Sequence, residues 1–139
     1  MPYTSQADLE ARYGAAELLA IADRDGDGLA DAAVVAQAIA DADAEIDSYL
    51  GGRYAVPLAE PAPLLVQRLA ADMARYRLQD DNPLDEVRDR YARSLAALRD
   101  LADGHASLPL AAAQGEAVGF QVATAAPGRR FTRDSLEGF

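Results

Sequence analysis

An acidic segment near the start of the chain, DRDGDGLAD, has the residue types that bind a hard cation. Four of its aspartates could act as ligands: Asp23, Asp25, Asp27 and Asp31. Counted from Asp23, they fill positions 1, 3, 5 and 9 of an EF-hand loop, and Gly28 takes the sharp-turn position 6. Carboxylate oxygens are the ligands that Ca²⁺ prefers in proteins, so this spacing makes the segment a candidate calcium site.

The same segment also has an interpretation without a metal. Position 12 of the loop is Val34, where an EF-hand has a bidentate glutamate, and position 8 is Ala30 instead of a β-branched residue. Glycines supply positive φ in a turn, and Asp27 or Asp31 could cap the helix that follows. The sequence therefore leaves two possibilities open, a weak structural metal site and a helix-to-helix turn.

Other chemistry-bearing patterns are missing from the sequence. There is no cysteine, and the single histidine, His105, has no second histidine or cysteine with which to share a metal. Neither a phosphate-binding glycine loop nor a GxSxG nucleophile motif is present. We therefore expect a protein that is not an enzyme and has no cofactor apart from the candidate Ca²⁺.

Length and composition favour one small helical domain. The chain has 139 residues, half of them apolar, with abundant alanine and no tryptophan, which is typical of packed helices. Of its net charge of −10, residues 1–51 contribute −9, so they repel phosphate and make nucleic-acid binding an improbable main function. No basic leader and no apolar run of about 20 residues occurs, so we expect a soluble cytosolic protein without a membrane segment.

Periodicity predicts an all-α fold with short N-terminal helices and two to three long antiparallel ones. Ser5 caps a first short helix that Gly14 ends, and AAELLAIA forms a second. Residues 31–50 form the strongest helix, with the apolar stripe Val35, Ile39, Ala42, Ile46 and Tyr49. GlyGly at 51–52 ends it, and a proline-rich connector follows.

Two further long helices follow the connector. Residues 62–78 carry the stripe Leu65, Leu69, Met73 and Tyr76. Asp72 lies at its edge, and we expect it to reach water, or alternatively to pair with Arg53 or Arg75. The last helix has Asn82 as N-cap and Gly104 past its end, with the stripe Val87, Tyr91, Leu95, Leu98 and Ala102. Its opposite side is a mixed-charge face that could contact identical subunits.

After Gly104 the helical pattern is lost, so we divide the chain into a helical domain, residues 1–104, and an extended C-terminal arm, residues 105–139. The arm contains GFQVA, a run that could add as a short strand to a partner, and it ends in a basic and aromatic segment. The candidate contact residues are Phe120, Val122, Arg129, Arg130, Phe131, Arg133 and Phe139. A docking arm and a frayed terminus explain these residues equally well.

Three blocks together resemble a family of Mu-like phage and prophage proteins, the gene-product thirty-six type. They are YTSQADLEARYG, ELLAIADRDGDGLADAAVVAQAIADADAEIDSYLGGRYAVPL and APLLVQRLAADMARYRL, and they cover most of residues 3–80. The DRDGDG loop and EIDSYLGGRYAVPL are the specific parts. The resemblance favours a shared structural turn in the loop.

The resemblance also implies a function. It points to a structural virion protein, a head-tail connector or adaptor in the neck of a tailed phage. During assembly this protein would be in the host cytoplasm. It implies a homo-oligomeric ring of about twelve copies under the portal protein, with a downstream neck or tail-completion protein as the other partner. The acidic N-terminal region would suit a channel through which genomic DNA passes without binding.

Overall fold

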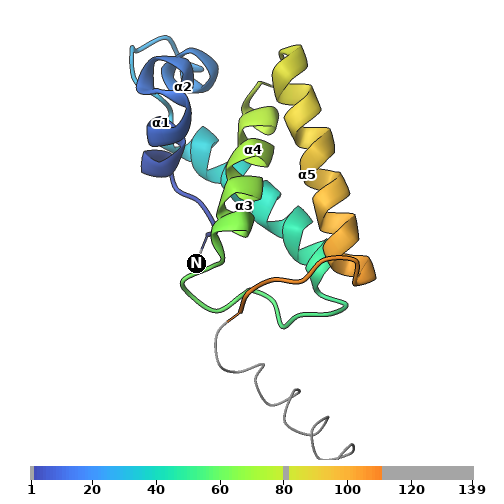
Figure 1. Ribbon diagram of the computed structural model, residues 1–139. Helices are drawn as coiled ribbons and strands as arrows, with labels where there is room; N and C mark the ends of the chain where they lie inside the picture. The colour runs from blue at the N-terminus through green and yellow to red at the C-terminus, as the bar shows by residue number, and fades with distance from the viewer. Residues whose placement is uncertain (1, 80–81, 111–139) are drawn as a thin grey trace, which may run out of the picture. The chain divides into compact units, whose positions relative to one another are not determined.

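The computed structural model describes residues 2–79 and 82–110, which contain five α-helices and no strand. Two short helices, α1 (Gln6–Tyr13) and α2 (Ala15–Ala22), precede three longer ones: α3 (Ala32–Leu50), α4 (Leu64–Leu78) and α5 (Asp85–Asp103) (Figure 1). The predicted all-α class is therefore confirmed for the described residues. By its contacts the chain divides into two units, Met1–Leu108 and Pro109–Phe139, and every described helix belongs to the first.

Local capping chemistry sets the ends of the first helix, as predicted. The Ser5 hydroxyl oxygen accepts a hydrogen bond from the Asp8 amide at 3.1 Å and so satisfies a free N–H of the first turn. Gly14 ends the helix at φ 96°, a conformation that an L-residue with a side chain adopts only under strain. Because α2 starts at the next residue, this glycine is the corner between the two helices.

The three longer helices pack together, and α4 is the central one. It contacts α1, α3 and α5, and Figure 1 shows α3 crossing behind it. Its buried residues cover more than one stripe, since all residues from Leu69 to Arg75 are buried. Alanines at 70, 71 and 74 leave room for neighbouring helices on several sides. The predicted stripe was therefore too narrow, because it omitted buried residues such as Ala70 and Arg75. Two of its members, Leu65 and Tyr76, are only half-buried.

Helices α3 and α5 bury one face each. On α3 the buried residues are Val35, Ala38, Ile39, Ala42, Ile46 and Leu50. Leu50 thus replaces the predicted Tyr49 at the end of the stripe. On α5 they are Val87, Ser94, Leu98 and Leu101. Full burial of a valine, leucine or isoleucine side chain contributes about 1.5–3 kcal/mol, so these two faces are a main source of stability.

The start of α5 differs from the prediction. The helix begins at Asp85, with Leu84 at the N-cap position, and Asn82 is not the cap. The preceding residues instead form a turn bonded to Gln79, whose carbonyl oxygen accepts from the Asn82 amide at 3.2 Å and whose side-chain oxygen accepts from the Leu84 amide at 2.8 Å. Because the Asn82 and Leu84 amides are used in this turn, the helix starts further along the chain. Its end at Gly104, with φ 85°, is as predicted.

The connector between α3 and α4 is non-helical, as its prolines predict, and side chains anchor it to the bundle. Arg53 donates from Nη1 to the Leu101 carbonyl at 2.7 Å and the Ala106 carbonyl at 3.1 Å. The Leu108 amide donates to the Tyr54 hydroxyl at 3.2 Å. Residues after α5 are thereby held on the helical unit up to Leu108, which is buried.

Within the described part of the chain, no helix combines the length and apolarity needed to cross a membrane.

Candidate functional site

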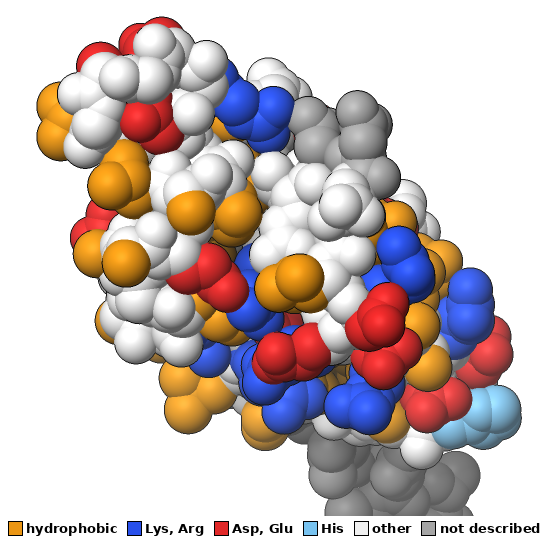
Figure 2. All heavy atoms as spheres, turned by 90° about the horizontal axis from the view of Figure 1, so that it is seen from above, with side chains coloured by type: hydrophobic (Ala, Val, Ile, Leu, Met, Phe, Trp, Pro, Cys, Tyr) orange, Lys and Arg blue, Asp and Glu red, His pale blue; other side chains and the backbone are white. Residues whose placement is uncertain are grey.

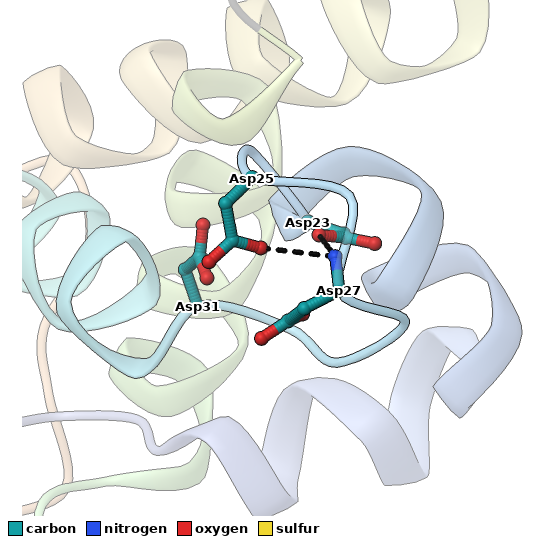
Figure 3. Close-up of side chains that lie close together, drawn as sticks. All are labelled: Asp23, Asp25, Asp27 and Asp31. Carbon is teal, nitrogen blue, oxygen red and sulfur yellow. Dashed lines mark hydrogen bonds between the residues drawn. The ribbon is translucent and has the colours of Figure 1, made fainter.

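The acidic loop between α2 and α3 brings together the four aspartates that the sequence singled out. One carboxylate oxygen from each of Asp23, Asp25, Asp27 and Asp31 lies within 4.8 Å of those of the other three. Figure 3 shows the four side chains arranged around the loop. All four are exposed or half-buried, so a cation could reach them from solvent. Whether a metal binds there stays a prediction.

Backbone amides of the loop itself hold its carboxylates. Asp23 accepts through Oδ1 from the Gly26 amide at 2.8 Å and through Oδ2 from the Gly28 amide at 3.0 Å. Asp25 Oδ1 accepts from the Asp27 amide at 3.1 Å (Figure 3). Gly26 and Gly28 have φ of 77° and 85°, the left-handed conformation that glycine adopts without strain. The aspartates and glycines thus fold this loop through local turns.

These contacts shift the acidities of two loop residues in opposite directions. Partial loss of hydration opposes ionisation of Asp23, but amide hydrogen bonds from Gly28 and Gly26 outweigh it and lower its pKa. For Asp25 the Asp27 amide lowers the pKa, yet desolvation, a hydrogen bond to Asp23 and neighbouring negative charges together raise it. Repulsion among the four carboxylates is the feature that a divalent cation would relieve.

A contact between the two ends of the loop closes it, and a further bond ties it to α4. Asp31 is the N-cap residue of α3, but its carboxylate makes no capping bond and instead accepts from the Arg24 amide at 2.9 Å. The predicted capping by Asp31 is therefore wrong, because the carboxylate points back into the loop. Arg24 donates from Nη2 to the Leu78 carbonyl at 3.1 Å, which fastens the loop to the end of α4.

A buried polar network at the centre of the bundle was not predicted as such. Arg75 of α4 binds Glu17 of α2 through two hydrogen bonds, with Nε to Oε2 at 2.9 Å, and its guanidinium lies 4.4 Å from the centre of the Tyr13 ring of α1. Burial alone would lower the pKa of Arg75, but hydrogen bonding to Glu17 raises it above its usual value. This paired fork-to-fork geometry links the short helices to the long ones.

Asp72 belongs to the same network, which corrects the prediction that it reaches water. Only 7% of the residue is exposed, and its carboxylate accepts from the Tyr13 hydroxyl. Its ion pair is with Arg90 of α5, at 3.6 Å, and not with Arg53 or Arg75. Burial and the bond to Asp72 raise the pKa of Tyr13. The one-dimensional stripe could not reveal these partners, because they come from α1 and α5.

A second polar contact joins the three long helices. Glu45 of α3 accepts hydrogen bonds from Arg77 of α4 and, at 2.9 Å, from the Tyr91 hydroxyl of α5. Tyr91 also stacks on Tyr76, with ring centroids 4.0 Å apart and planes 6° from parallel. Burial, together with the bond to Glu45, raises the pKa of Tyr91 to about 12. These contacts fix the relative positions of the three helices.

The N-terminal segment is fastened to α3 by two carboxylates. The Tyr3 amide donates to Asp43 Oδ2 at 3.2 Å, and the Tyr3 hydroxyl donates to Asp47 and accepts from the Leu58 amide at 2.9 Å. Burial raises the pKa of Tyr3 to about 12. Desolvation also raises the pKa of Asp43 to about 6, even though the Tyr3 amide opposes the shift.

A polar pocket of about 270 Å³ lies between α4 and α5, and the sequence gave no indication of it. Its lining consists of Arg68, Leu69, Asp72, Arg90, Arg93 and Ser94. Seen from above, the molecule has arginine and carboxylate side chains interleaved along one edge, apart from the acidic corner on the opposite side (Figure 2). The α5 arginines had been interpreted as part of a mixed-charge face, and their convergence with Arg68 depends on how α4 packs.

The predicted arm residues Phe120, Val122, Arg129, Arg130, Phe131, Arg133 and Phe139 lie outside the described residues, as does the possible strand in GFQVA. His105 is exposed, and its Nδ1 lies 3.8 Å from Asp100 Oδ1 at the end of α5.

The described residues form a small helical unit with these charged surfaces, and the sequence matches a known phage family. Residues 3–124 match the family described as "Bacteriophage Mu, Gp36". The chain is 40% identical over 80 residues to the Mu-like prophage FluMu protein gp36 of Haemophilus influenzae, covering 58% of this chain and 56% of that protein. It is 34% identical over 105 residues to gene product J of Escherichia phage Mu, covering 75% of this chain and 74% of that protein.

The protein therefore belongs to the bacteriophage Mu Gp36 family, and it is a phage-associated protein. The resemblance inferred from the sequence is confirmed. The match extends through all five helices and beyond the last described residue, so it covers the acidic loop as well as the polar network.

Proposed function

We propose that this protein is a head-tail connector of a tailed phage, with a structural rather than a catalytic role. In this proposal about twelve copies form a ring under the portal protein and join the DNA-filled head to a neck or tail-completion protein. The observation that carries it is the match of residues 3–124 to the Gp36 family, together with the relatives in phage Mu and a Mu-like prophage.

The structure supports this proposal through its rigidity. A ring under load needs subunits whose helices keep their relative positions. Here, partly buried ion pairs and hydrogen bonds at Arg75 and Glu45 link helices that are far apart in the sequence. The high negative charge, −10 for the whole chain, suits a protein beside a DNA channel, because like charge prevents phosphate from binding.

The first experiment is electron microscopy of particles made by a phage that lacks this gene. We expect heads separated from complete tails, and we expect the wild-type gene supplied in trans to restore joined particles. Normal, joined and infectious particles without the gene would overturn the connector proposal.

A truncation tests the part of the proposal that concerns the arm. Removing residues 117–139 leaves every described helix in place, so we expect a folded chain that no longer enters the particle. Helix content and melting temperature by circular dichroism control for folding. Incorporation of the truncated chain at the wild-type level would remove the arm from the proposal.

The clustered aspartates favour calcium binding as a second candidate function. Four carboxylate oxygens within 4.8 Å of one another offer part of a Ca²⁺ site, although six to eight oxygens are usual. Calorimetry should then give heat on titration with Ca²⁺, and a variant carrying Asp25→Ala and Asp27→Ala should give none. Asp41→Ala, an exposed carboxylate outside the loop, is the matched control. No heat and no rise in melting temperature for the wild type would exclude the idea.

A further inference from the structure

The pocket between α4 and α5 contains more positive charge than its own surroundings neutralise. Arg90 is shared between Asp72, at 3.6 Å, and Glu86, at 3.2 Å. Arg68 and Arg93 are exposed, and no carboxylate of the described residues lies within ion-pair distance of either. In a chain with a net charge of −10, two guanidinium groups without an ion pair among the described residues, beside a third that is already paired, form a site suited to an acidic partner.

This pocket opens on the side of α4 that faces away from α3. Arg77 reaches Glu45 of α3, so its position marks the α3-facing side of the helix. Arg68 precedes it by nine residues, which at about 100° per residue places it half a turn around the helix axis. The pocket is lined only by residues of α4 and α5. The arginine pocket and the outer surface of α3 are therefore on opposite sides of one bundle.

The outer surface of α3 has the complementary charge. The helix contains no lysine or arginine, and Asp41 is its exposed acid. The other three acids are half-buried and engaged within the chain: Asp43 and Asp47 bind Tyr3, and Glu45 binds Arg77 and Tyr91. Asp41 is exposed, and its Oδ1 accepts from the neutral Gln37 side chain of the same helix at 2.8 Å. Ala44, three residues further along and on the same side of the helix, is also exposed, and its small side chain allows a second surface to approach Asp41 closely.

We infer that the pocket of Arg68, Arg90 and Arg93 binds the exposed Asp41 carboxylate on α3 of a second copy of this chain. Because the two surfaces lie on opposite sides of the molecule, the contact is heterologous and repeats from one copy to the next. Such head-to-tail contacts close into a ring when the rotation per copy permits. The inference rests on the proposed connector function and identifies the lateral interface of its ring.

The test is complementation of the phage that lacks this gene, with charge-reversed variants of the full chain. The double variant Arg68→Glu and Arg93→Glu places carboxylates against a carboxylate. We therefore expect the number of joined particles to fall at least about tenfold relative to wild type. Asp41→Arg alone should fail in the same way. Combining Arg93→Glu with Asp41→Arg restores opposite charges between neighbours, and it should recover joined particles.

The controls separate this inference from folding and from the connector function. All three substituted positions are exposed, and each variant should melt within a few degrees of wild type. Arg99→Glu, an exposed α5 arginine outside the pocket, should complement fully. If the double variant complements like wild type, or if combining Arg93→Glu with Asp41→Arg recovers no joined particles, the assigned interface is wrong while the connector proposal stands. Normal particles without the gene would instead overturn the connector function itself.

Discussion

Removal of Glu17 should destabilise the helical unit more than removal of a carboxylate that forms a surface ion pair on α1. Its partner Arg75 keeps only 8% of its side-chain surface in water, so the change Glu17→Ala leaves a nearly buried guanidinium without its paired acceptor. Breaking a buried ion pair from one side costs about 3–5 kcal/mol. Because the Glu17 side chain is 26% exposed and Glu86 lies 3.8 Å from Arg75, we expect about 2–3 kcal/mol here.

The assay is urea unfolding followed by circular dichroism, with the melting temperature as a second measure. A loss of about 2–3 kcal/mol corresponds to a fall in melting temperature of roughly 10 °C or more for a unit of this size. The matched control is Asp8→Ala, which breaks the ion pair with Arg12 on the surface of α1, where both side chains are about one-third exposed. It also removes the hydrogen bond that the Thr4 hydroxyl donates to the same carboxylate, so we expect a loss of about 1 kcal/mol.

A double variant separates the cost of an unpaired buried charge from other effects of removing Glu17. If burial of an unpaired charge is the main cost, then removing both charges with Glu17→Leu and Arg75→Met should restore most of the stability lost in Glu17→Ala. A loss for Glu17→Ala no larger than that of Asp8→Ala would refute the view that this ion pair holds the short helices on the bundle. A double variant as unstable as the single one would refute the assignment of the cost to an unpaired charge.

Three further predictions concern individual contacts. Burial raises the pKa of Asp43 to about 6, so this acid stabilises the fold most below pH 4 and loses that contribution as the pH rises through 6. In urea unfolding at pH 8, Asp43→Asn should therefore increase the free energy of unfolding by about 1 kcal/mol, after allowance for the half-exposed position of the side chain. At pH 4.5 the same substitution should change it little. An unchanged difference at the two pH values would contradict this. Tyr91→Phe loses a hydrogen bond to the α3 carboxylate and should cost about 1 kcal/mol, whereas Tyr49→Phe, at a half-buried α3 position, should cost little; equal losses would argue against the bond. Gly104→Ala places a side chain on a residue with φ 85° and should lower the free energy of unfolding by about 1 kcal/mol. The control Gly52→Ala adds a side chain in open space at a residue without positive φ and should not lower it. Equal melting temperatures for the two variants would show that the cap tolerates a side chain.

Local chemistry in the sequence was enough to determine the helical class and several helix ends. Ser5 and Gly14 specify the ends of α1 because capping involves groups only a few residues apart. The stripe of Val35, Ile39 and Ile46 identified α3 because periodicity reports which face of a helix is buried. The four loop aspartates were found as a cluster for the same reason, since their spacing is short enough to bring their oxygens together.

Only the tertiary structure decided which polar side chains meet. Asp72 is buried because Tyr13 and Arg90, from helices before and after it, supply its partners. Burial of α4 on several sides likewise depends on neighbours distant along the chain. The arginine pocket follows from the packing of α4 against α5. Sequence periodicity gives the direction of one helix face, whereas a buried pair or a pocket requires the positions of two or more helices at once.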